Sequence, residues 1–115
     1  MTSVSLNPPA PLSGAEKRFL RSLAHILRPV VQIGKDGLSE GVIQATHSAL
    51  EQHELIKVSI NGESPTERKS GAVSLATSTG SHVVQVIGRV LILYRQHEQE
   101  PQITLPRPKK KRKES

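Results

Sequence analysis

Residues 30–40, VVQIGKDGLSE, decide the fold, because they change from an apolar strand into a helix across two glycines. The β-branched run Val30 to Ile33 is typical of a strand. Apolar positions after the turn predict a helix from about Ser39 to His53, and Leu55 to Ile60 alternates as a strand with one buried face does. A strand-helix-strand unit of this kind places its two strands parallel.

Helices are expected on both sides of this unit. Upstream, Ser13 and Glu16 have the spacing of a capping box, and the helix that they begin is expected to run to about Leu27, before Pro29. Downstream, Ser64-Pro65-Thr66-Glu67 has the same spacing and predicts a third helix, which ends at Thr79-Gly80 because glycine favours the left-handed residue after a helix.

Two further apolar runs, Val83 to Ile87 and Val90 to Tyr94, are separated only by Gly88-Arg89, which indicates a tight β-hairpin. The order is then αβαβαββ. It predicts an α+β domain in two layers with a four-stranded mixed sheet. Lys57 and Ser59 share one side of their strand, so one sheet face is expected to be partly wet.

Length and charge limit the organisation of the chain and its partners. The 115 residues are enough for one domain, which we place at residues 12–96, after an unstructured N-terminus at residues 1–11. A basic flexible tail is expected at residues 97–115. The formal charge of +6 is shared: residues 1–96 hold ten Lys or Arg against seven acids, and residues 97–115 hold six against three. Such a balance favours nucleic acid as the partner.

Other classes of protein find little support in the composition. The chain has no cysteine, which excludes disulfides and thiolate metal sites, and it shows neither a leader nor a membrane-spanning pattern. We expect a cytoplasmic monomer without a cofactor or a metal. Catalysis is not expected either, since no histidine pair has metal-ligand spacing and the glycine turn lacks the ending of a phosphate-binding P-loop. Glu51 and Glu54 lie one helical turn apart and are expected to be exposed, solubilising carboxylates.

The glycine turn is the first candidate site. A strand-to-helix corner presents unpaired N–H groups and the positive end of the helix dipole, so it can bind an anion. Gly34 and Gly37 would let a phosphate approach the backbone, and Lys35 would add a cation, whereas Asp36 would repel phosphate. The alternative is purely structural: Gly34 supplies a positive φ, Gly37 relieves crowding, and Asp36 caps the helix.

Basic residues elsewhere form the second candidate site. The first helix carries Lys17, Arg18, Arg21 and Arg28, with Glu16 as the only interleaved acid, and these cations could form one surface with Lys35. Their alternative role is a solvated helix face. Weaker candidates are Lys57, Arg89 and Arg95. With only Phe19 and Tyr94 as aromatic residues, binding by base stacking is not expected to dominate, so contacts should be largely with phosphate and ribose.

The tail holds a third basic group, which comprises Arg107, Lys109, Lys110, Lys111, Arg112 and Lys113. A run of this kind is read either as a nuclear import signal or as an arm on ribosomal RNA. We favour the arm.

Three segments together resemble a known family: LRPVVQIGKDGLSEGVI, ALEQHELIKVSI and VVQVIGRVLILYR, in this order and spacing, over about residues 12–96. They resemble the CRM domain, the chloroplast RNA splicing and ribosome maturation module, in its small bacterial form known as YhbY. The resemblance implies an αβαβαββ fold similar to the C-terminal domain of translation initiation factor three. It also implies RNA binding through the glycine loop, here Gly34, Lys35, Asp36 and Gly37, and association with precursors of the large ribosomal subunit.

The sequence therefore predicts a non-enzymatic RNA-binding protein that acts on precursor large-subunit ribosomal RNA in pre-ribosomal particles. Two alternatives stay open. One is a protein-interaction adaptor on the ribosome, which RNase treatment of a pull-down would distinguish because its partners would persist. The other is a splicing or messenger-RNA regulator, which sequencing of crosslinked RNA would identify.

Overall fold

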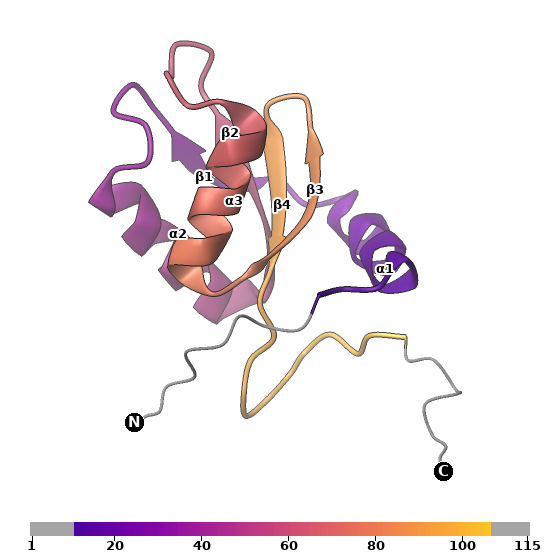
Figure 1. The fold of residues 1–115 in the computed structure, drawn as a ribbon. Coiled ribbons are helices and arrows are strands. Elements are labelled where there is room, and N and C mark those ends of the chain that lie inside the picture. Colours follow the sequence, from indigo (N-terminus) through magenta and orange to yellow (C-terminus); the bar gives the residue numbers. More distant parts are fainter. Residues whose placement is uncertain (1–10, 107–115) are drawn as a thin grey trace.

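The computed structural model describes residues 11–106, which fold as seven elements in the expected αβαβαββ order (Figure 1). The element bounds are α1 Gly14–Ala24, β1 Pro29–Ile33, α2 Glu40–His53, β2 Leu55–Ile60, α3 Arg68–Thr79, β3 His82–Ile87 and β4 Val90–Tyr94. Residues 1–10 and the basic tail residues 107 and 109–113 lie outside the described part.

The four strands form one mixed sheet in the order β1-β2-β4-β3. β1 and β2 are parallel, as the strand-helix-strand unit predicts, with Ile33 beside Ile60. β4 lies between β2 and β3 and is antiparallel to both. The predicted hairpin between β3 and β4 is confirmed, and Gly88 in its turn has a φ of 58°, a value that glycine adopts without strain.

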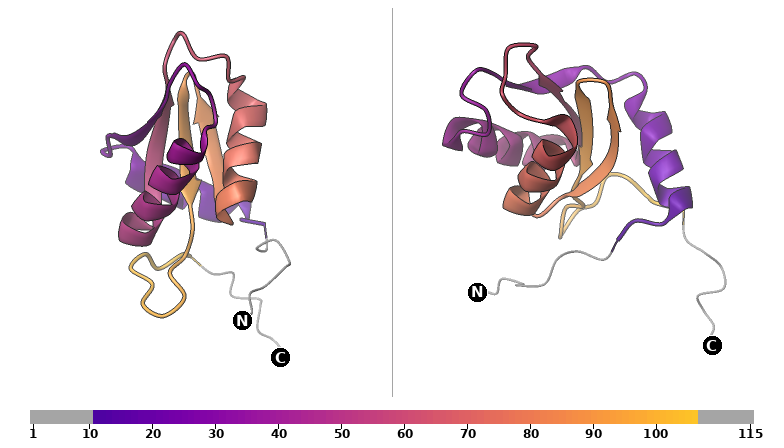
Figure 2. Two further views of the ribbon diagram at one scale, coloured as in Figure 1. Left: turned by 90° about the vertical axis from the view of Figure 1, so that its left-hand side faces the viewer. Right: turned by 45° about the horizontal axis from the view of Figure 1, so that its top comes forward.

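The sheet is covered on both faces, which differs from the two layers that we expected. α2 and α3 pack on one face over the larger core, which includes Ile33, Leu50 and Leu75. α1 packs on the opposite face, where Leu20 and Ala24 join a second core cluster with Leu55, Val84, Ile92 and Tyr94. Figure 2 shows α1 on the far side of the hairpin from the other two helices. β1 lies beyond the cover of α1, so on that face Gln32 is exposed and its partner Ser59 on β2 is half-buried, as the expected partly wet face requires.

The end of α1 was misplaced in the prediction, and the cause is local. The capping box at Ser13 is confirmed, but α1 ends at Ala24 and not near Leu27. The chain tightens there through a hydrogen bond from Leu27 N to Ala24 O at 2.9 Å, a three-residue step that often closes a helix. Pro29 also disfavours a helical conformation for the residue before it.

The predicted capping box at Ser64 is wrong, because Glu67 caps α3 instead. Ser64 Oγ accepts a hydrogen bond from Thr66 N at 3.3 Å and thereby closes a turn before the helix. The Glu67 carboxylate accepts from Ser70 N at 2.8 Å and from Lys69 N at 3.2 Å. These backbone hydrogen bonds, with that from Ser70 the stronger, hold the pKa of Glu67 below its usual value. The C-terminal end of α3 is as predicted, with Gly80 at a φ of 67°.

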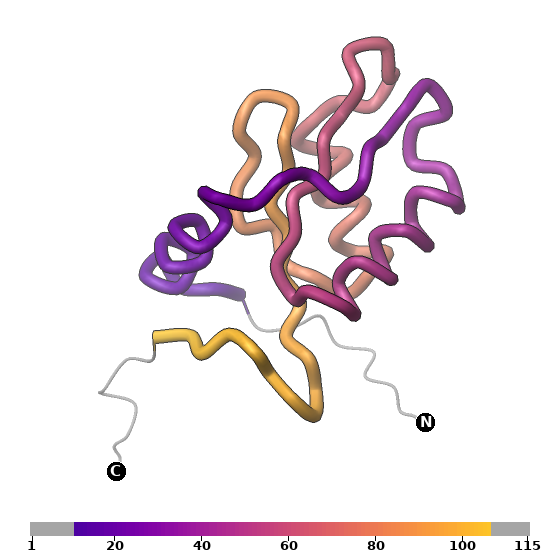
Figure 3. Tube along the Cα trace, turned by 180° about the vertical axis from the view of Figure 1, so that it is seen from behind, coloured from indigo at the N-terminus to yellow at the C-terminus, as the bar shows by residue number. Residues whose placement is uncertain are grey.

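Residues 97–106 pack against the domain, although we expected a flexible tail from residue 97 onward. Glu54 is fully buried, and its carboxylate accepts hydrogen bonds from the backbone N–H groups of His97, Gln102 and Ile103 at 2.8 to 2.9 Å. Ile103 and Leu105 then pack on the α1 core cluster. Figure 3 shows this segment passing alongside α1.

Candidate nucleic-acid interface

Three loops meet at one end of the sheet: the glycine turn between β1 and α2, the loop between β2 and α3, and the tip of the β3–β4 hairpin (Figure 1). Backbone hydrogen bonds join them. Asn61 N donates to Ile33 O at 2.8 Å, and Ile60 N donates to Arg89 O at 2.8 Å. The structure thus brings Arg89 to the same end of the molecule as Lys35.

Gly37 has a structural role in the turn. Its N–H donates to Gly34 O at 3.0 Å, which closes a turn with Lys35 and Asp36 at the tip. Its φ of 68° lies in the left-handed region, and a Cβ atom there would lie 3.3 Å from Thr66 Oγ1. The cap of α2 is Ser39, whose Oγ accepts from Val42 N at 3.2 Å, and not Asp36 as the structural alternative assumed.

We expect Gly37→Ala to lower the free energy of unfolding by about 1 to 2 kcal/mol, because an L-residue is strained at a positive φ. Urea denaturation measures this change. The control is Gly41→Ala at an exposed position in the first turn of α2, where the φ is ordinary and the nearest non-neighbouring atom to a new Cβ is Ser39 Oγ at 3.8 Å. Equal midpoints for the two variants would contradict a structural role of Gly37.

Gly34 differs from Gly37, because the fold does not require glycine at this position. Its φ lies outside the left-handed region, and a Cβ atom would have no neighbour within 4 Å. The expected positive φ at Gly34 is therefore wrong. The backbone at Gly34 is open although the fold does not require it to be. A ligand that approaches the backbone closely could use this space.

The charge at this end of the sheet is balanced. Lys35 Nζ lies 3.7 Å from Glu63 Oε1, and both side chains are more than 70 % exposed, so water screens the pair. Opposite charges are equally frequent on the three loops and the helix starts beside them: Lys35, Arg68, Lys69 and Arg89 against Asp36, Glu40, Glu63 and Glu67. The glycine turn therefore lacks the strong positive field that would bind phosphate by itself.

The positive charge of the described residues is concentrated on α1 and the residues that follow it. Lys17, Arg18, Arg21 and Arg28 are all exposed, and within residues 11–106 none of them forms an ion pair. We call these four residues the α1 cation group. Lys17, Arg18 and Arg21 lie on α1, on the opposite face of the sheet from α2 and α3, and Arg28 directly precedes β1, so the structure does not merge the group with Lys35 into one cluster (Figure 2).

Lys57 and Arg95, two weaker candidates, make internal contacts. Lys57 Nζ donates to Leu27 O at 3.1 Å and so fixes the link between α1 and β1 on the sheet. Arg95 donates to Thr79 O at 2.7 Å and to Glu51 Oε2 at 3.1 Å, which ties α3 to α2. Both cations therefore have structural partners.

Glu54 is the residue that sequence reasoning misjudged, because we expected it to be exposed. It ends α2 with a φ of 64°, directly before β2, where the chain reverses. Its three hydrogen-bond donors lie more than forty residues along the chain. No local pattern indicates such a contact.

Two other features were sought in the described part of the chain, a metal site and a membrane span. Residues 11–106 contain no group of three or more His, Asp or Glu side chains placed to hold a metal ion. Among the helices described, none has both the length and the apolar composition of a membrane span.

The sheet order, the three loops and the cationic α1 define a small α+β domain with one mixed sheet and helices on both faces. The chain belongs to the CRS1/YhbY (CRM) domain family, which matches residues 12–95. A Bacillus subtilis relative named "Probable RNA-binding protein YqeI" is 41% identical over 95 residues, which cover 83% of this chain and 99% of the relative. An "RNA-binding protein" of Haemophilus influenzae is 44% identical over 96 residues, which cover 84% of this chain and 96% of the relative.

A solved structure supports the fold. The solution structure of a hypothetical protein from Staphylococcus aureus is similar to this chain with a TM-score of 0.72 and 42% identity. The likeness covers 83% of this chain and 99% of that protein. The α+β fold predicted from the sequence is thus confirmed.

Proposed function

We propose that this protein binds RNA without catalysing a reaction, and that its target is precursor large-subunit ribosomal RNA during ribosome assembly in the cytoplasm. The observation that carries the proposal is the α1 cation group, four exposed cations with a single acid, Glu16, among them. A surface of this kind attracts phosphate without a competing internal ion pair. Membership of the CRM family and the names of the relatives support RNA as the partner.

Two surfaces of the protein contribute differently to RNA binding. The α1 cation group, together with the basic tail, supplies most of the affinity through phosphates and little sequence preference. The glycine turn supplies close approach at Gly34, where a sugar or phosphate can reach the backbone. Residues 97–106 pass alongside α1, where Ile103 and Leu105 pack on the α1 core cluster (Figure 3).

The test of the loop is Gly34→Leu. We expect its free energy of unfolding to stay within about 0.5 kcal/mol of the parent value, as for most surface substitutions. Its affinity for precursor large-subunit ribosomal RNA should fall by about tenfold, because the side chain fills the open corner and removes on the order of one good contact. Filter binding across a salt series measures the affinity.

Ser48→Leu is the control, since it adds the same bulk at an exposed position on the outer side of α2. An unchanged affinity for Gly34→Leu would show that the glycine turn is only structural. If the parent chain binds this RNA no better than an unrelated RNA of equal length, the assignment to ribosomal precursors is refuted.

A further inference from the structure

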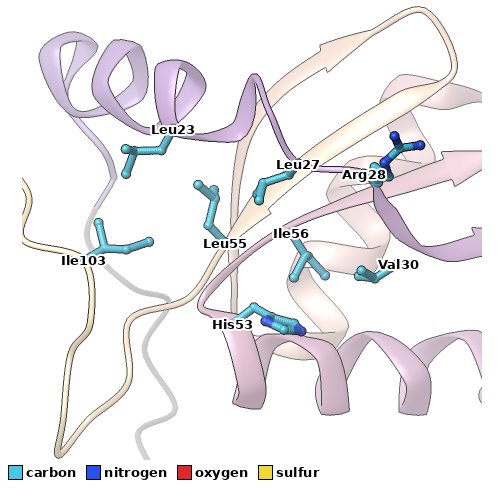
Figure 4. Close-up of a pocket in the computed structure, with 8 residues that line it drawn as sticks. All are labelled: Leu23, Leu27, Arg28, Val30, His53, Leu55, Ile56 and Ile103. Carbon is cyan, nitrogen blue, oxygen red and sulfur yellow. The ribbon is translucent and has the colours of Figure 1, made fainter.

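An apolar pocket of about 370 Å³ opens between the end of α1, the start of β1 and the segment that follows β4 (Figure 4). Its aliphatic lining comes from five elements or segments and comprises Leu23, Leu27, Val30, Leu55, Ile56 and Ile103. Figure 4 shows the side chains of Leu23, Leu27, Leu55 and Ile103 pointing toward one another. The volume lies in the range of about 300 to 1,000 Å³ that is typical of small-molecule sites.

Apolar surface around this pocket is exposed to an unusual extent. Val30 is 53% exposed and Leu23 is 37% exposed, and the neighbouring Ile26 is 84% exposed. Exposed large aliphatic side chains in and next to one pocket indicate a binding site, because each would gain by being covered.

The polar and charged side chains near the pocket limit the ligands that it can bind. Arg28 and His53 are the polar side chains that line it, and Arg28 belongs to the α1 cation group. The buried carboxylate beside His53, that of Glu54, already accepts three backbone hydrogen bonds. The exposed acids of the packed segment are Glu98 and Glu100. An apolar cavity with an arginine among its lining residues fits a ligand that has an apolar part beside an anionic one.

We propose that this pocket receives an unpaired base of the bound RNA, while Arg28 contacts the phosphate next to it. This inference rests on the proposed function and extends it from phosphate contacts to a base contact. It also reconciles RNA binding with the scarcity of aromatic residues, because aliphatic walls take the place of stacking on rings. Glu54 is a positioning residue for the pocket, since it holds the segment from which Ile103 forms one wall.

The experiment compares two short single strands that differ only in the bases: an oligouridylate and a strand with the same ribose phosphates and no bases. The full chain is titrated with each strand at low salt and fluorescence anisotropy is recorded. We expect the oligouridylate to bind at least about fivefold more tightly, as the burial of one apolar group the size of a base predicts. Val30→Gln should remove most of this ratio and leave the affinity for the baseless strand unchanged, because it alters no charge.

Val73→Gln is the matched control, since Val73 is 60% exposed on α3, on the other side of the sheet. It should leave both affinities unchanged. Equal affinities of the parent chain for the two strands would overturn the pocket while leaving phosphate binding intact. An unchanged ratio in a folded Val30→Gln variant would likewise overturn it, and would favour another occupant of the pocket, such as a protein side chain. If neither strand binds, the proposed function fails together with the pocket.

Discussion

Glu54→Ala is expected to lower the free energy of unfolding by about 3 kcal/mol and to release residues 97–106 from the domain. The Glu54 carboxylate is fully buried and accepts three backbone N–H groups at 2.8 to 2.9 Å. Hydrogen bonds to a charged group in a dry environment are among the strongest in proteins. Alanine would remove all three, and the freed N–H groups could regain partners only by moving into water.

Two readouts separate the parts of this prediction. Urea denaturation gives the free energy of unfolding, and amide hydrogen exchange at His97, Gln102 and Ile103 reports release of the segment. Glu54→Gln keeps the side-chain shape and one acceptor oxygen, which can still accept from Gln102 N and Ile103 N, so it should have a smaller effect. A Glu54→Ala variant with protected amides at these three positions would refute the anchoring role.

Glu51→Ala is the matched control for Glu54→Ala. Glu51 lies one turn earlier on α2, but its side chain is 75% exposed and pairs with Arg95 at 3.1 Å. Arg95 keeps its hydrogen bond to Thr79 O without Glu51, so the loss of a carboxylate this exposed should cost about 0 to 1 kcal/mol. From the sequence the two carboxylates look alike, and only the return of the chain after β4 makes them different.

The order of elements could be predicted because its signals are local. The alternation in β2, the glycine in the β3–β4 turn and the left-handed Gly80 each depend on a few neighbouring residues. The prediction of the α3 cap failed because two residues with capping side chains, Ser64 and Glu67, lie within four positions; Ser64 closes the turn before the helix, and Glu67 caps it. The packing of α1 on the second face of the sheet could not be predicted from local patterns.

The candidate site was predictable in part for the same reason. Cation clustering on α1 is visible in the sequence, since acids are nearly absent there. The internal roles of Lys57 and Arg95 depend on acceptors that are distant in the sequence. Leu27 O lies 30 residues from Lys57, and Thr79 O lies 16 residues from Arg95. Composition cannot tell a cation that faces solvent from one that holds two helices together.

The proposed RNA surface makes its strongest prediction for the double variant Lys17→Glu with Arg21→Glu. We expect about a hundredfold loss of affinity for precursor large-subunit ribosomal RNA at low salt. The slope of log affinity against log salt should also fall by about 1.4 in magnitude, since each single-strand phosphate contact contributes about 0.7. Both side chains are exposed and form no ion pair within residues 11–106, so the fold should persist, which circular dichroism checks.

The control for this variant must change the net charge equally at another place. Arg68→Glu with Lys69→Glu does so at the start of α3, where the helix dipole tolerates acids. If α1 is the RNA surface, this control should lose only the general attraction, a few-fold in affinity at low salt, and keep its salt slope. Equal losses in the two variants would mean that net charge alone attracts the RNA. In that case the glycine turn, whose surroundings are electrically balanced, would be the next place to seek a specific contact with the RNA backbone.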